Sequence, residues 1–358
     1  MPRRTATLLA STLTLIALLC AGLLLPVPYS EMSPGPTVNT LGEHGGEPVL
    51  QITGRKTYKT TGHLNMTTVR VTSADYSMNL VEVVAGWLAG DQKVVEHDTL
   101  YPSGQTAEQA DQENAEEFTQ SQDSAKVAAL KELGIPVGSR VIVSAVVKGG
   151  ASEGLLHAGD AIKAVDGTAV KAASDVAELV TKHQPGEKVV FTVVPAKDAG
   201  KKNAATKDVT ITTKKSDDDG KARAVVGIQA GVEHTFPFKI DIKLADVGGP
   251  SAGLMFALGI VDKLTPTDLT DGKFVAGTGT IDDDGKVGPI GGIDMKTIGA
   301  RSKGAQYFLT PSDNCAEAAK DTPSGLRLVK VKTIDDAMAA LKKIRTGDTA
   351  SLPSCSAG

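Results

Sequence analysis

The sequence predicts an α+β/α/β protein with an N-terminal transmembrane helix and a mixed helix–strand domain, into which a small β-barrel with two helices is inserted. Three observations lead to this fold class. An uncharged apolar stretch follows two arginines at the N-terminus. Short alternating strands separated by Gly-containing turns fill residues 135–215. A strand, a glycine turn and a strongly apolar helix follow one another between residues 238 and 264.

Composition excludes several classes of function. The chain has 358 residues, 41% of them hydrophobic, which is enough to bury more than one core. Its 38 basic and 42 acidic residues give a net charge of −4, no basic block is present, and 4% of residues are aromatic. This argues against a nucleic-acid partner. The zinc motif HExxH and the phosphate loop GxxxxGK[ST] are both absent, so we expect neither a metal nor a cofactor.

The N-terminus reads as a membrane anchor. Arg3 and Arg4 precede the uncharged stretch from Thr5 to Leu25, which as a helix spans roughly 30 Å, the thickness of a hydrocarbon core. A cleaved signal peptide is the alternative, but the run is long for one and no A-x-A site precedes Pro26. The arginines stay inside, so we expect a single-pass cell-membrane protein with its other domains extracytoplasmic.

Three cysteines are present. Cys20 lies in the apolar stretch, where Leu19 replaces the small residue that a lipoprotein cleavage site requires. Cys315 and Cys355 remain for the oxidising exterior, where a disulfide between them would hold the C-terminal tail to the domain.

The chain after the anchor divides by composition. A Pro/Gly/Ser-rich segment follows the anchor, then strands and two helices, an acidic surface helix over 101–122 and a compact helix from Asp123 to Gly134. A hinge is expected at 216–221. The predicted parts are the anchor (1–26), a linker (27–48), a first domain segment (49–134), the small β-barrel (135–215), a second domain segment (216–345) and a flexible tail (346–358).

The small β-barrel resembles a PDZ domain of the kind associated with bacterial proteases. The resemblance rests on "GASEGLLHAGDAIKAVDG", residues 150–167, where Asp166–Gly167 makes a tight hairpin turn. It implies a groove that captures an extended peptide, often a C-terminus, by strand addition. The carboxylate-binding loop would be Leu133, Gly134 and Ile135. The alternative is that Gly134 only ends the preceding helix.

Ser251 stands in "VGGPSAG", residues 247–253, at the head of an apolar helix whose first turn suits Pro250. An isolated serine there is usually an ordinary polar residue of a helix N-terminus. Flanking glycines, however, let a substrate backbone approach, and free N–H groups at a helix start can stabilise an oxyanion. The six histidines have no partner motif, so a lysine with a lowered pKa is the better candidate base. Lys296 follows a glycine turn among apolar residues, although most helical lysines are solvated.

The two motifs together resemble the proteolytic domain of Lon-type proteases. "GGPSAG" is followed, 45 residues after its serine, by the lysine of "PIGGIDMK", with "GTGTIDDDGKVGPIGG" between them. The resemblance implies that Ser251 is the nucleophile and Lys296 its base, and that Thr278 helps to hold the lysine. It runs from Val225 to Ile344 and resumes upstream in "GHLNMTTVRV" and "SQDSAKVAALKELG", so the PDZ-like block would be inserted in a split Lon-type domain.

Two features depart from that family. Lon-type enzymes commonly have an acidic residue three positions before the serine, where this chain has Gly248; Asp246 is the nearest substitute. The 358 residues also contain no ATPase module, so substrates would have to be extended or loosely folded. The layout resembles the membrane-anchored PDZ-Lon-like proteins of Gram-positive, actinobacterial type.

The sequence therefore predicts an ATP-independent, membrane-anchored serine endopeptidase acting on proteins or peptides. Backbone N–H groups around Gly249 and Ser251 would hold the oxyanion. The family resemblance implies a homo-oligomer, a hexamer. The alternatives are a non-catalytic cell-surface PDZ scaffold with a degenerate protease domain, and a structural envelope protein; a serine-reactive probe distinguishes them from a protease.

Overall fold

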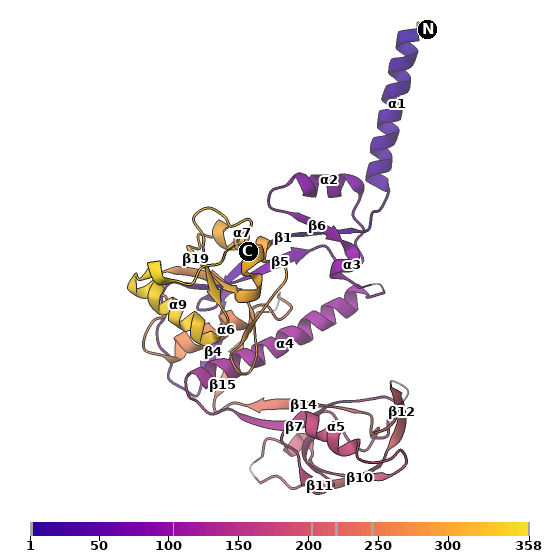
Figure 1. Cartoon of the computed structure of the whole chain (residues 1–358), viewed down its shortest axis with the longest axis vertical. Helices are drawn as coiled ribbons and strands as arrows, with labels where there is room; N and C mark the ends of the chain where they lie inside the picture. The colour runs from indigo at the N-terminus through magenta and orange to yellow at the C-terminus, as the bar shows by residue number, and fades with distance from the viewer. Residues whose placement is uncertain (1–2, 103, 202, 219–220, 245–246, 357–358) are drawn as a thin grey trace. The chain divides into compact units, whose positions relative to one another are not determined.

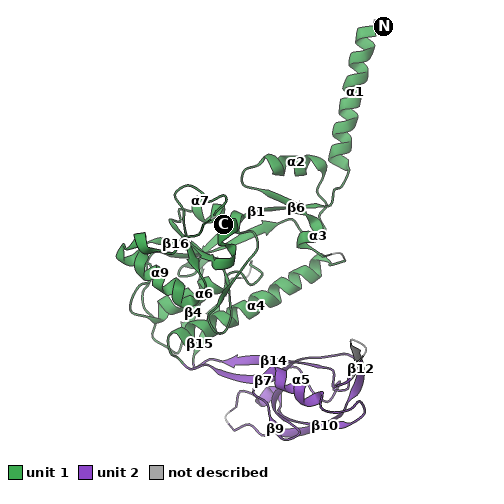
Figure 2. Cartoon of the chain, viewed as in Figure 1, with its two compact units in different colours: residues 1–135, 238–358 green, residues 136–237 purple. Residues whose placement is uncertain are grey.

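A computed structural model describes residues 3–102, 104–201, 203–218, 221–244 and 247–356. The chain forms two compact units (Figure 2). Unit 1 comprises Met1–Ile135 and Phe238–Gly358, and unit 2 comprises Pro136–Pro237. Unit 2 is therefore an insertion in unit 1, as the sequence predicts, but it extends to residue 237 rather than 215.

Unit 1 is organised around a six-stranded sheet in the order β20-β19-β16-β5-β1-β6 (Figure 1). Strands β20, β19, β16 and β5 run parallel to one another, whereas β1 is antiparallel to both β5 and β6. The strands are β1 (Tyr29–Asn39), β5 (His63–Val71), β6 (Lys93–Glu96), β16 (Phe274–Gly277), β19 (Tyr307–Pro311) and β20 (Arg327–Val331). Short pairs outside this sheet are β2 (Glu43–His44) with β3 (Glu47–Pro48), β4 (Leu50–Thr53) with β15 (Lys239–Ile242), and β17 (Thr280–Ile281) with β18 (Val287–Gly288).

The helices of unit 1 pack on this sheet and on one another. They are α1 (Arg3–Leu24), α2 (Leu80–Leu88), α3 (His97–Leu100), α4 (Ala107–Glu132), α6 (Gly253–Leu264), α7 (Ile293–Ser302), α8 (Cys315–Ala318) and α9 (Ile334–Thr346), with single turns η2 (Ser312–Asn314) and η3 (Thr349–Ser351). Helix α6 packs on β5 and against α4 and α9, and α7 packs on β1 and β5. Residues Gly253 to Asp262 of α6 are all buried, so this helix is the centre of the core.

Helix α4 is one continuous helix where the sequence suggests two. It starts with a capping box at Thr106 and Gln109, so Asp123, the expected helix start, lies mid-helix. The acidic segment and the compact helix merge because buried residues recur at helical spacing through both, including Phe118, Ser121 and Ala125. Phe118 meets Phe256 of α6 edge to face, with ring centroids 5.8 Å apart.

The expectation of a linker over residues 27–48 is wrong. Strand β1 occupies half of that range and sits between β5 and β6, and the pair β2–β3 lies in the remainder. Its Pro34-Gly35-Pro36 sequence is accommodated at a shift in register between Pro34 and Thr37, where the ladder is interrupted. A Cβ on Gly35 would overlap Thr68, so glycine permits the close approach of β1 and β5. Proline and glycine here mark a bulge within a strand.

Residues 349–356 of the C-terminal tail pack on unit 1, contrary to the prediction of a flexible tail over 346–358. Leu352 is buried, Lys330 N–H donates to the Pro353 carbonyl (2.9 Å), and Ser354 bridges to Val329 of β20. The structure joins Cys355 to Cys315 by a disulfide, the pair put forward from the sequence. Cysteine pairing and strand addition therefore hold the tail against unit 1.

Helix α1 is, among the described residues, the one helix long and apolar enough to cross a membrane. Its 22 residues are almost wholly exposed, with Gly22 as the buried exception. A membrane span and a signal sequence both satisfy this description.

Unit 2 contains a sheet in the order β11-β10-β8-β7-β14, with β9 beside β8. Its core includes the fully buried Val143, Val165 and Phe191. The elements are β7 (Gly138–Val146), β8 (Ala161–Val165), β9 (Thr168–Ala169), α5 (Ala173–Val180), β10 (Lys188–Val194), η1 (Ala196–Asp198), β11 (Lys207–Thr212), β12 (Lys214–Asp218), β13 (Lys221–Val225) and β14 (Ile228–Thr235).

Two expectations for unit 2 require correction. The hinge expected at 216–221 is occupied by β12 and β13, which pair with each other. Of the two helices expected in the β-barrel, α5 is present. The other, expected near residues 151–156, is replaced by turns, in which Leu156 N–H donates to the Ser152 carbonyl. Strand β14 belongs to this sheet because it pairs with β7 over its whole length.

Candidate active site

Ser251 lies in the tight turn that precedes α6. The helix begins at Gly253, two residues after the serine, so Pro250 belongs to the turn and not to the first helical turn expected for it. Gly249 adopts a φ of 78°, which favours glycine. Ser251 is half-buried at the edge of the apolar core that α6 fills.

Both peptide groups next to Ser251 are fixed by hydrogen bonds. The Pro250 carbonyl accepts from Ser121 Oγ of α4 (2.9 Å). The Ser251 carbonyl accepts from Gly279 N–H (2.8 Å) and from Thr278 Oγ1 (2.9 Å). In a trans peptide the N–H points opposite to the carbonyl, so these bonds also set the directions of the Ser251 and Ala252 N–H groups.

Lys296 is buried in the first turn of α7. Its side chain is 2% exposed, and the neighbouring Ile293, Met295 and Thr297 are buried as well. Burial disfavours the charged ammonium and lowers the pKa of Lys296 to about 7, from an ordinary value of 10.5. A substantial fraction of this amine is therefore neutral near pH 7, unlike that of a solvated lysine.

Thr278 connects the lysine to the serine turn. Lys296 Nζ donates to Thr278 Oγ1 (3.2 Å), and the same oxygen donates its hydrogen to the Ser251 carbonyl (2.9 Å). The amine and the serine backbone are therefore two hydrogen bonds apart. A hydroxyl carries one hydrogen, so Thr278 accepts from Lys296 whether the amine is charged or neutral. The lone pair of the neutral amine stays available for another donor.

The segment before Lys296 is held by a residue that follows it in the sequence, Asn314. Asn314 accepts from Ile290 N–H through its side-chain oxygen and donates to the Ile290 carbonyl, both at 2.9 Å. Asn314 directly precedes Cys315 of the disulfide. Gly292 is the N-cap residue of α7 and has a φ of 64°. A Cβ there would overlap Val69 and Met32 of the sheet. The lysine helix thus starts at a fixed point.

Gly249 cannot serve as the oxyanion donor expected from the sequence. Its N–H donates to the Asn114 carbonyl of α4 at 2.8 Å, so that hydrogen is already used. Gly248 packs against the same helix: a Cβ at this position would stand 3.0 Å from Asn114 Cβ. A side chain at Gly248 would require Asn114 to shift slightly, so glycine favours the close approach of the turn to α4. Asp246, the suggested substitute, lies outside the described residues.

Asn114 and Ser121 are site residues that the sequence analysis missed. Both lie on α4, more than 120 positions before Ser251. Ser121 opens the stretch "SQDSAKVAALKELG", which the sequence analysis used only as a helix, and Asn114 lies outside it. The available signal was the polar Ser121 at a position where the helical periodicity requires an apolar residue.

A groove of about 270 Å³ runs beside Pro250, lined on one side by Ser121 and Ser124 of α4 and on the other by residues 280–282.

The histidines form no comparable site. His97 Nδ1 lies 2.9 Å from Ser30 Oγ, but Ser30 is fully buried and out of reach of a substrate. His183 pairs with Asp166 at 2.7 Å in unit 2, where it supports the turn after β8. Among the described residues, no group of three or more His, Cys, Asp and Glu side chains is arranged to hold a metal ion.

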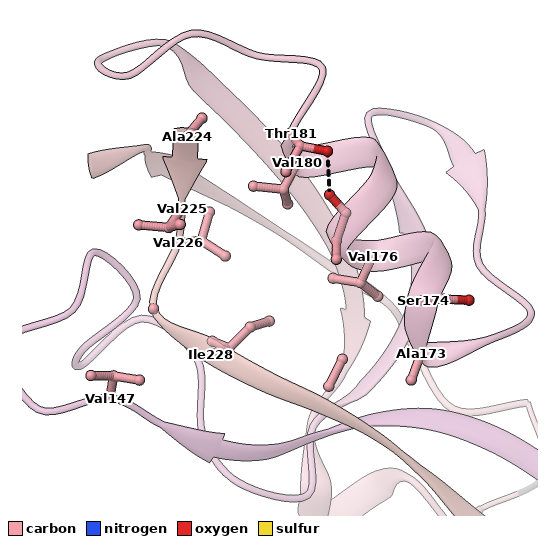
Figure 3. Close-up of a pocket in the computed structure, with 13 residues that line it drawn as sticks. Val147, Ala173, Ser174, Val176, Val180, Thr181, Ala224, Val225, Val226 and Ile228 are labelled. Atoms are coloured by element: carbon pink, nitrogen blue, oxygen red, sulfur yellow. Dashed lines mark hydrogen bonds between the residues drawn. The ribbon is translucent and has the colours of Figure 1, made fainter. Parts of the chain in front are cut away.

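Unit 2 contains a separate apolar groove between α5 and the start of β14. Its volume is about 600 Å³, and Figure 3 shows Val176 and Val180 of the helix on one side and Ile228 of the strand on the other. Strand β14 is an edge strand of its sheet, so its outer backbone groups are not used by a neighbouring strand. The groove therefore offers both an apolar floor and a strand edge.

The first backbone N–H groups of the β14 edge are not used by β7. The Gly227 carbonyl points toward β7, because it accepts a hydrogen bond from Val147 N–H (2.9 Å), next to the paired residues Ile228 and Val146. The N–H of Ile228 consequently points away from β7. The Val226 carbonyl is held by Ser152 through both N–H (2.9 Å) and Oγ (2.7 Å), which turns the Gly227 N–H to the opposite side. With Gly227 at a φ of 73°, these successive N–H groups form a site suited to a carboxylate.

The residues predicted as the peptide-binding loop do not line this groove. Leu133, Gly134 and Ile135 lie at the end of α4 in unit 1. Gly134, at a φ of 65°, and Ile135 return N–H bonds to Lys131 and Leu130. They cap the helix, which is the alternative reading of Gly134.

Comparison with known proteins finds two matching regions in the chain. Residues 245–343 match the family described as Lon protease (S16) C-terminal proteolytic domain. Lon protease of Azospirillum brasilense is 39% identical over 93 residues, which are 25% of this chain and 11% of that protein. Lon protease 1 of Sorangium cellulosum is 37% identical over 102 residues, 27% of this chain and 12% of that protein. The chain thus spans little more than a tenth of the length of these curated relatives.

Residues 111–213 match the PDZ domain family. The PDZ domain of an SdrC-like protein from Listeria monocytogenes is 23% identical, covering 25% of this chain and 86% of that one with a TM-score of 0.21. The corresponding domain from Listeria innocua is 25% identical, covering 25% and 90% with a TM-score of 0.20. From the family matches, the chain combines a Lon-type C-terminal proteolytic domain with a PDZ domain.

We expect the buried amine of Lys296 to make folding stability depend on pH. Between about pH 7 and pH 10 the unfolded chain holds a proton on this lysine that the folded chain has lost, so stability rises with pH. The slope attributable to one group is at most roughly 1.4 kcal/mol per pH unit. Urea unfolding at several pH values measures it as the difference between wild type and Lys296→Met.

The control is Lys303→Met, which removes an exposed amine just after α7. It should leave the pH dependence of wild type unchanged. A difference between wild type and Lys296→Met that stays flat from neutral to alkaline pH would show that the amine is not shifted.

Proposed function

We propose that the chain is a membrane-anchored serine endopeptidase in which Ser251 is the nucleophile and Lys296 its general base, with the PDZ groove capturing extended or C-terminal peptide segments. The observation that carries the proposal is the shared contact at Thr278. A buried lysine with a pKa of about 7 and the proposed nucleophile's backbone meet at one hydroxyl. The match of residues 245–343 to the Lon proteolytic domain supports a serine-type peptidase.

In the proposed reaction the neutral amine of Lys296 takes the proton of Ser251 Oγ as that oxygen attacks a peptide carbonyl carbon. The resulting ammonium then gives its proton to the departing amide nitrogen, which leaves as an amine and an acyl-enzyme remains. Water, deprotonated by the same lysine, attacks the ester, and the proton returns to Ser251. No step uses a nucleotide or a metal.

The oxyanion would be held by the backbone N–H groups of Ser251 and Ala252, in place of Gly249. The Ser251 N–H shares its peptide group with the Pro250 carbonyl, which Ser121 fixes. The Ala252 N–H shares its peptide group with the Ser251 carbonyl, which Thr278 and Gly279 fix. Donors that are already oriented stabilise developing charge without reorganisation, which is the main source of their effect. The groove beside Pro250 gives an extended substrate room next to them.

The membrane location rests on three features. Helix α1 has the length and composition of a span. Arg3 and Arg4 favour retention of its N-terminus inside the cell. The Cys315–Cys355 disulfide suits an oxidising compartment. We therefore place both units on the outer side of the cell membrane.

The decisive test is cleavage of an unfolded protein, such as reduced casein, by the purified full chain without nucleotide. Ser251→Ala and Lys296→Met should each reduce the rate by several orders of magnitude, because the two groups act as a unit. The wild-type kcat/KM should rise between about pH 6 and pH 8 as Lys296 loses its proton.

A serine-reactive phosphonate probe separates the alternatives in the same preparation. Wild type should be labelled at Ser251, and the matched variant Ser351→Ala, which removes an exposed hydroxyl far along the chain, should be labelled equally. A folded wild-type chain that binds peptides but neither cleaves nor labels is instead the non-catalytic scaffold.

Removing the Ser121 hydroxyl should reduce kcat with little change in KM. The hydroxyl orients the Pro250–Ser251 peptide group, and its effect on the oxyanion is indirect, so we expect roughly a tenfold loss, compared with 10²–10³ for a direct donor. Steady-state kinetics of Ser121→Ala measure it. Thr119→Ala removes an exposed hydroxyl from the same helix and should behave as wild type; equal kinetics for both variants would exclude the positioning role.

Peptide capture should depend on the groove of unit 2. Ala177 is exposed on α5 and lines the groove, so Ala177→Glu places a carboxylate there without disturbing the core. Binding of a fluorescent peptide with a free C-terminal valine should weaken at least about tenfold, because the charge opposes both the apolar floor and the carboxylate. Lys182→Glu adds a glutamate just outside the groove as the control, and equal weakening by both would argue against this site.

A further inference from the structure

Helix α2 presents an apolar face that the described residues of unit 1 leave largely exposed. The α2 apolar face consists of Leu80, Val81, Val84, Trp87 and Leu88. Their exposed fractions run from 42% for Val81 to 60% for Trp87 and 82% for Leu88. The spacing i, i+1, i+4, i+7 and i+8 places them along one side of the helix. Five large apolar side chains on a nine-residue helix are more than scattered surface residues.

The opposite side of α2 is already packed. Val83 is 1% exposed, and a Cβ on Gly86 would stand 2.7 Å from Val94 of β6. No rotation of the helix can therefore hide the apolar face. The one charged residue of α2, Glu82, is engaged in its N-terminal capping box with Asn79 and accepts from Tyr76 Oη at 2.8 Å. The exposed face consequently carries no charge.

Contacts with α1 fix the depth of α2 relative to that helix. Gly22, in the last turn of α1, lies so that a Cβ would stand 3.6 Å from Val81. Just beyond α1, Val27 N–H donates to the Met78 carbonyl (2.8 Å), and Pro26 bridges to Asn79. Figure 1 shows α2 beside the C-terminal end of α1. If α1 spans a bilayer, α2 lies at the level where the chain leaves it.

The aromatic residues sit at the same level. Tyr29 follows α1 by five residues and meets Trp87 edge to face, with ring centroids 6.1 Å apart. Tryptophan and tyrosine are enriched at the membrane–water boundary, where an apolar ring body and a polar N–H or O–H are both satisfied. The exposed Leu24 and Leu25 at the end of α1 extend the apolar surface toward them.

We propose that the α2 apolar face is a second membrane contact, inserted into the headgroup–acyl boundary next to the point where α1 leaves the bilayer. The inference rests on the proposed anchoring by α1. The occupant is lipid, since the face is uncharged, continuous with the end of the span, and set at boundary depth by Gly22 and Val27. Binding depends on apolar burial, so neutral lipid is sufficient.

The consequence concerns orientation. Helix α2 packs on β6 and β1, which are strands of the central sheet, whereas α1 is joined to that sheet through a short segment after Leu24. A single helix leaves a domain free to swing about its exit point. A second contact, made by a helix that packs on the edge strand β6 and its neighbour β1, would hold unit 1 in a defined orientation relative to the membrane surface.

Trp87 is the only tryptophan of the chain, so its fluorescence tests the proposal directly. The full chain is reconstituted into phosphatidylcholine vesicles with normal or brominated acyl chains. Flotation first reports whether α1 anchors the protein. We then expect Trp87 emission at short wavelength, strong quenching by brominated chains and weak quenching by aqueous iodide.

Two variants define the controls. Val84→Glu combined with Leu88→Glu changes exposed positions only, so the chain should still fold and float, but Trp87 should become accessible to iodide and lose its quenching by brominated lipid. A chain with Trp87→Phe and Lys342→Trp carries its tryptophan on the exposed side of α9 and should be quenched by iodide alone.

Failure of the two proposals looks different. A wild-type chain that does not float contradicts anchoring. A chain that floats while Trp87 stays open to iodide overturns the second contact alone. A chain that floats with Trp87 shielded from both iodide and brominated lipid also overturns it, because the face is then covered by protein, such as a second copy of this chain.

Discussion

The site depends on one hydroxyl that two segments of the chain share. Thr278 Oγ1 accepts from the Lys296 amine and donates to the Ser251 carbonyl. Burying a lysine is costly when its amine is charged, and the fold reduces this cost by giving the amine an acceptor and by letting it go neutral. The same arrangement that makes the residue tolerable in the core leaves it with a free lone pair near neutral pH. Stability and the proposed chemistry thus impose the same requirement.

Helix α4 provides the other boundary of the site. It contacts the serine turn at Asn114 and Ser121, while residues 278–279 hold the turn from the far side. The turn has no regular secondary structure of its own to satisfy its backbone groups, so neighbouring elements supply the partners. Glycine at position 248 favours this contact, because a Cβ there would stand 3.0 Å from Asn114 Cβ of α4.

The sequence predicted the parts of the site that local chemistry defines. The glycine turn before an apolar helix and the lysine after a second glycine turn are short-range patterns, and the family resemblance joined them. Asn114 and Ser121 were missed because their contacts with the serine turn join segments more than 120 residues apart in the sequence. Pro34-Gly35-Pro36 suggested a linker because local propensity says nothing of a bulge inside a sheet. Leu133–Ile135 looked like a binding loop, but the same residues also complete a helix cap, and only the tertiary placement decides between the two.

The point of insertion of unit 2 has a physical consequence for the serine turn. The chain enters unit 2 directly from the end of α4 and leaves it into β15, which is followed by the segment that becomes the turn itself. The two covalent connections of unit 2 therefore lead to the two segments that meet at Gly249 and Asn114. Helix α4 is continuous over 26 residues and carries buried residues along its length. The serine turn therefore rests on an element that adjoins unit 2, whereas the start of the lysine helix is held separately, by Asn314 and the disulfide-linked tail.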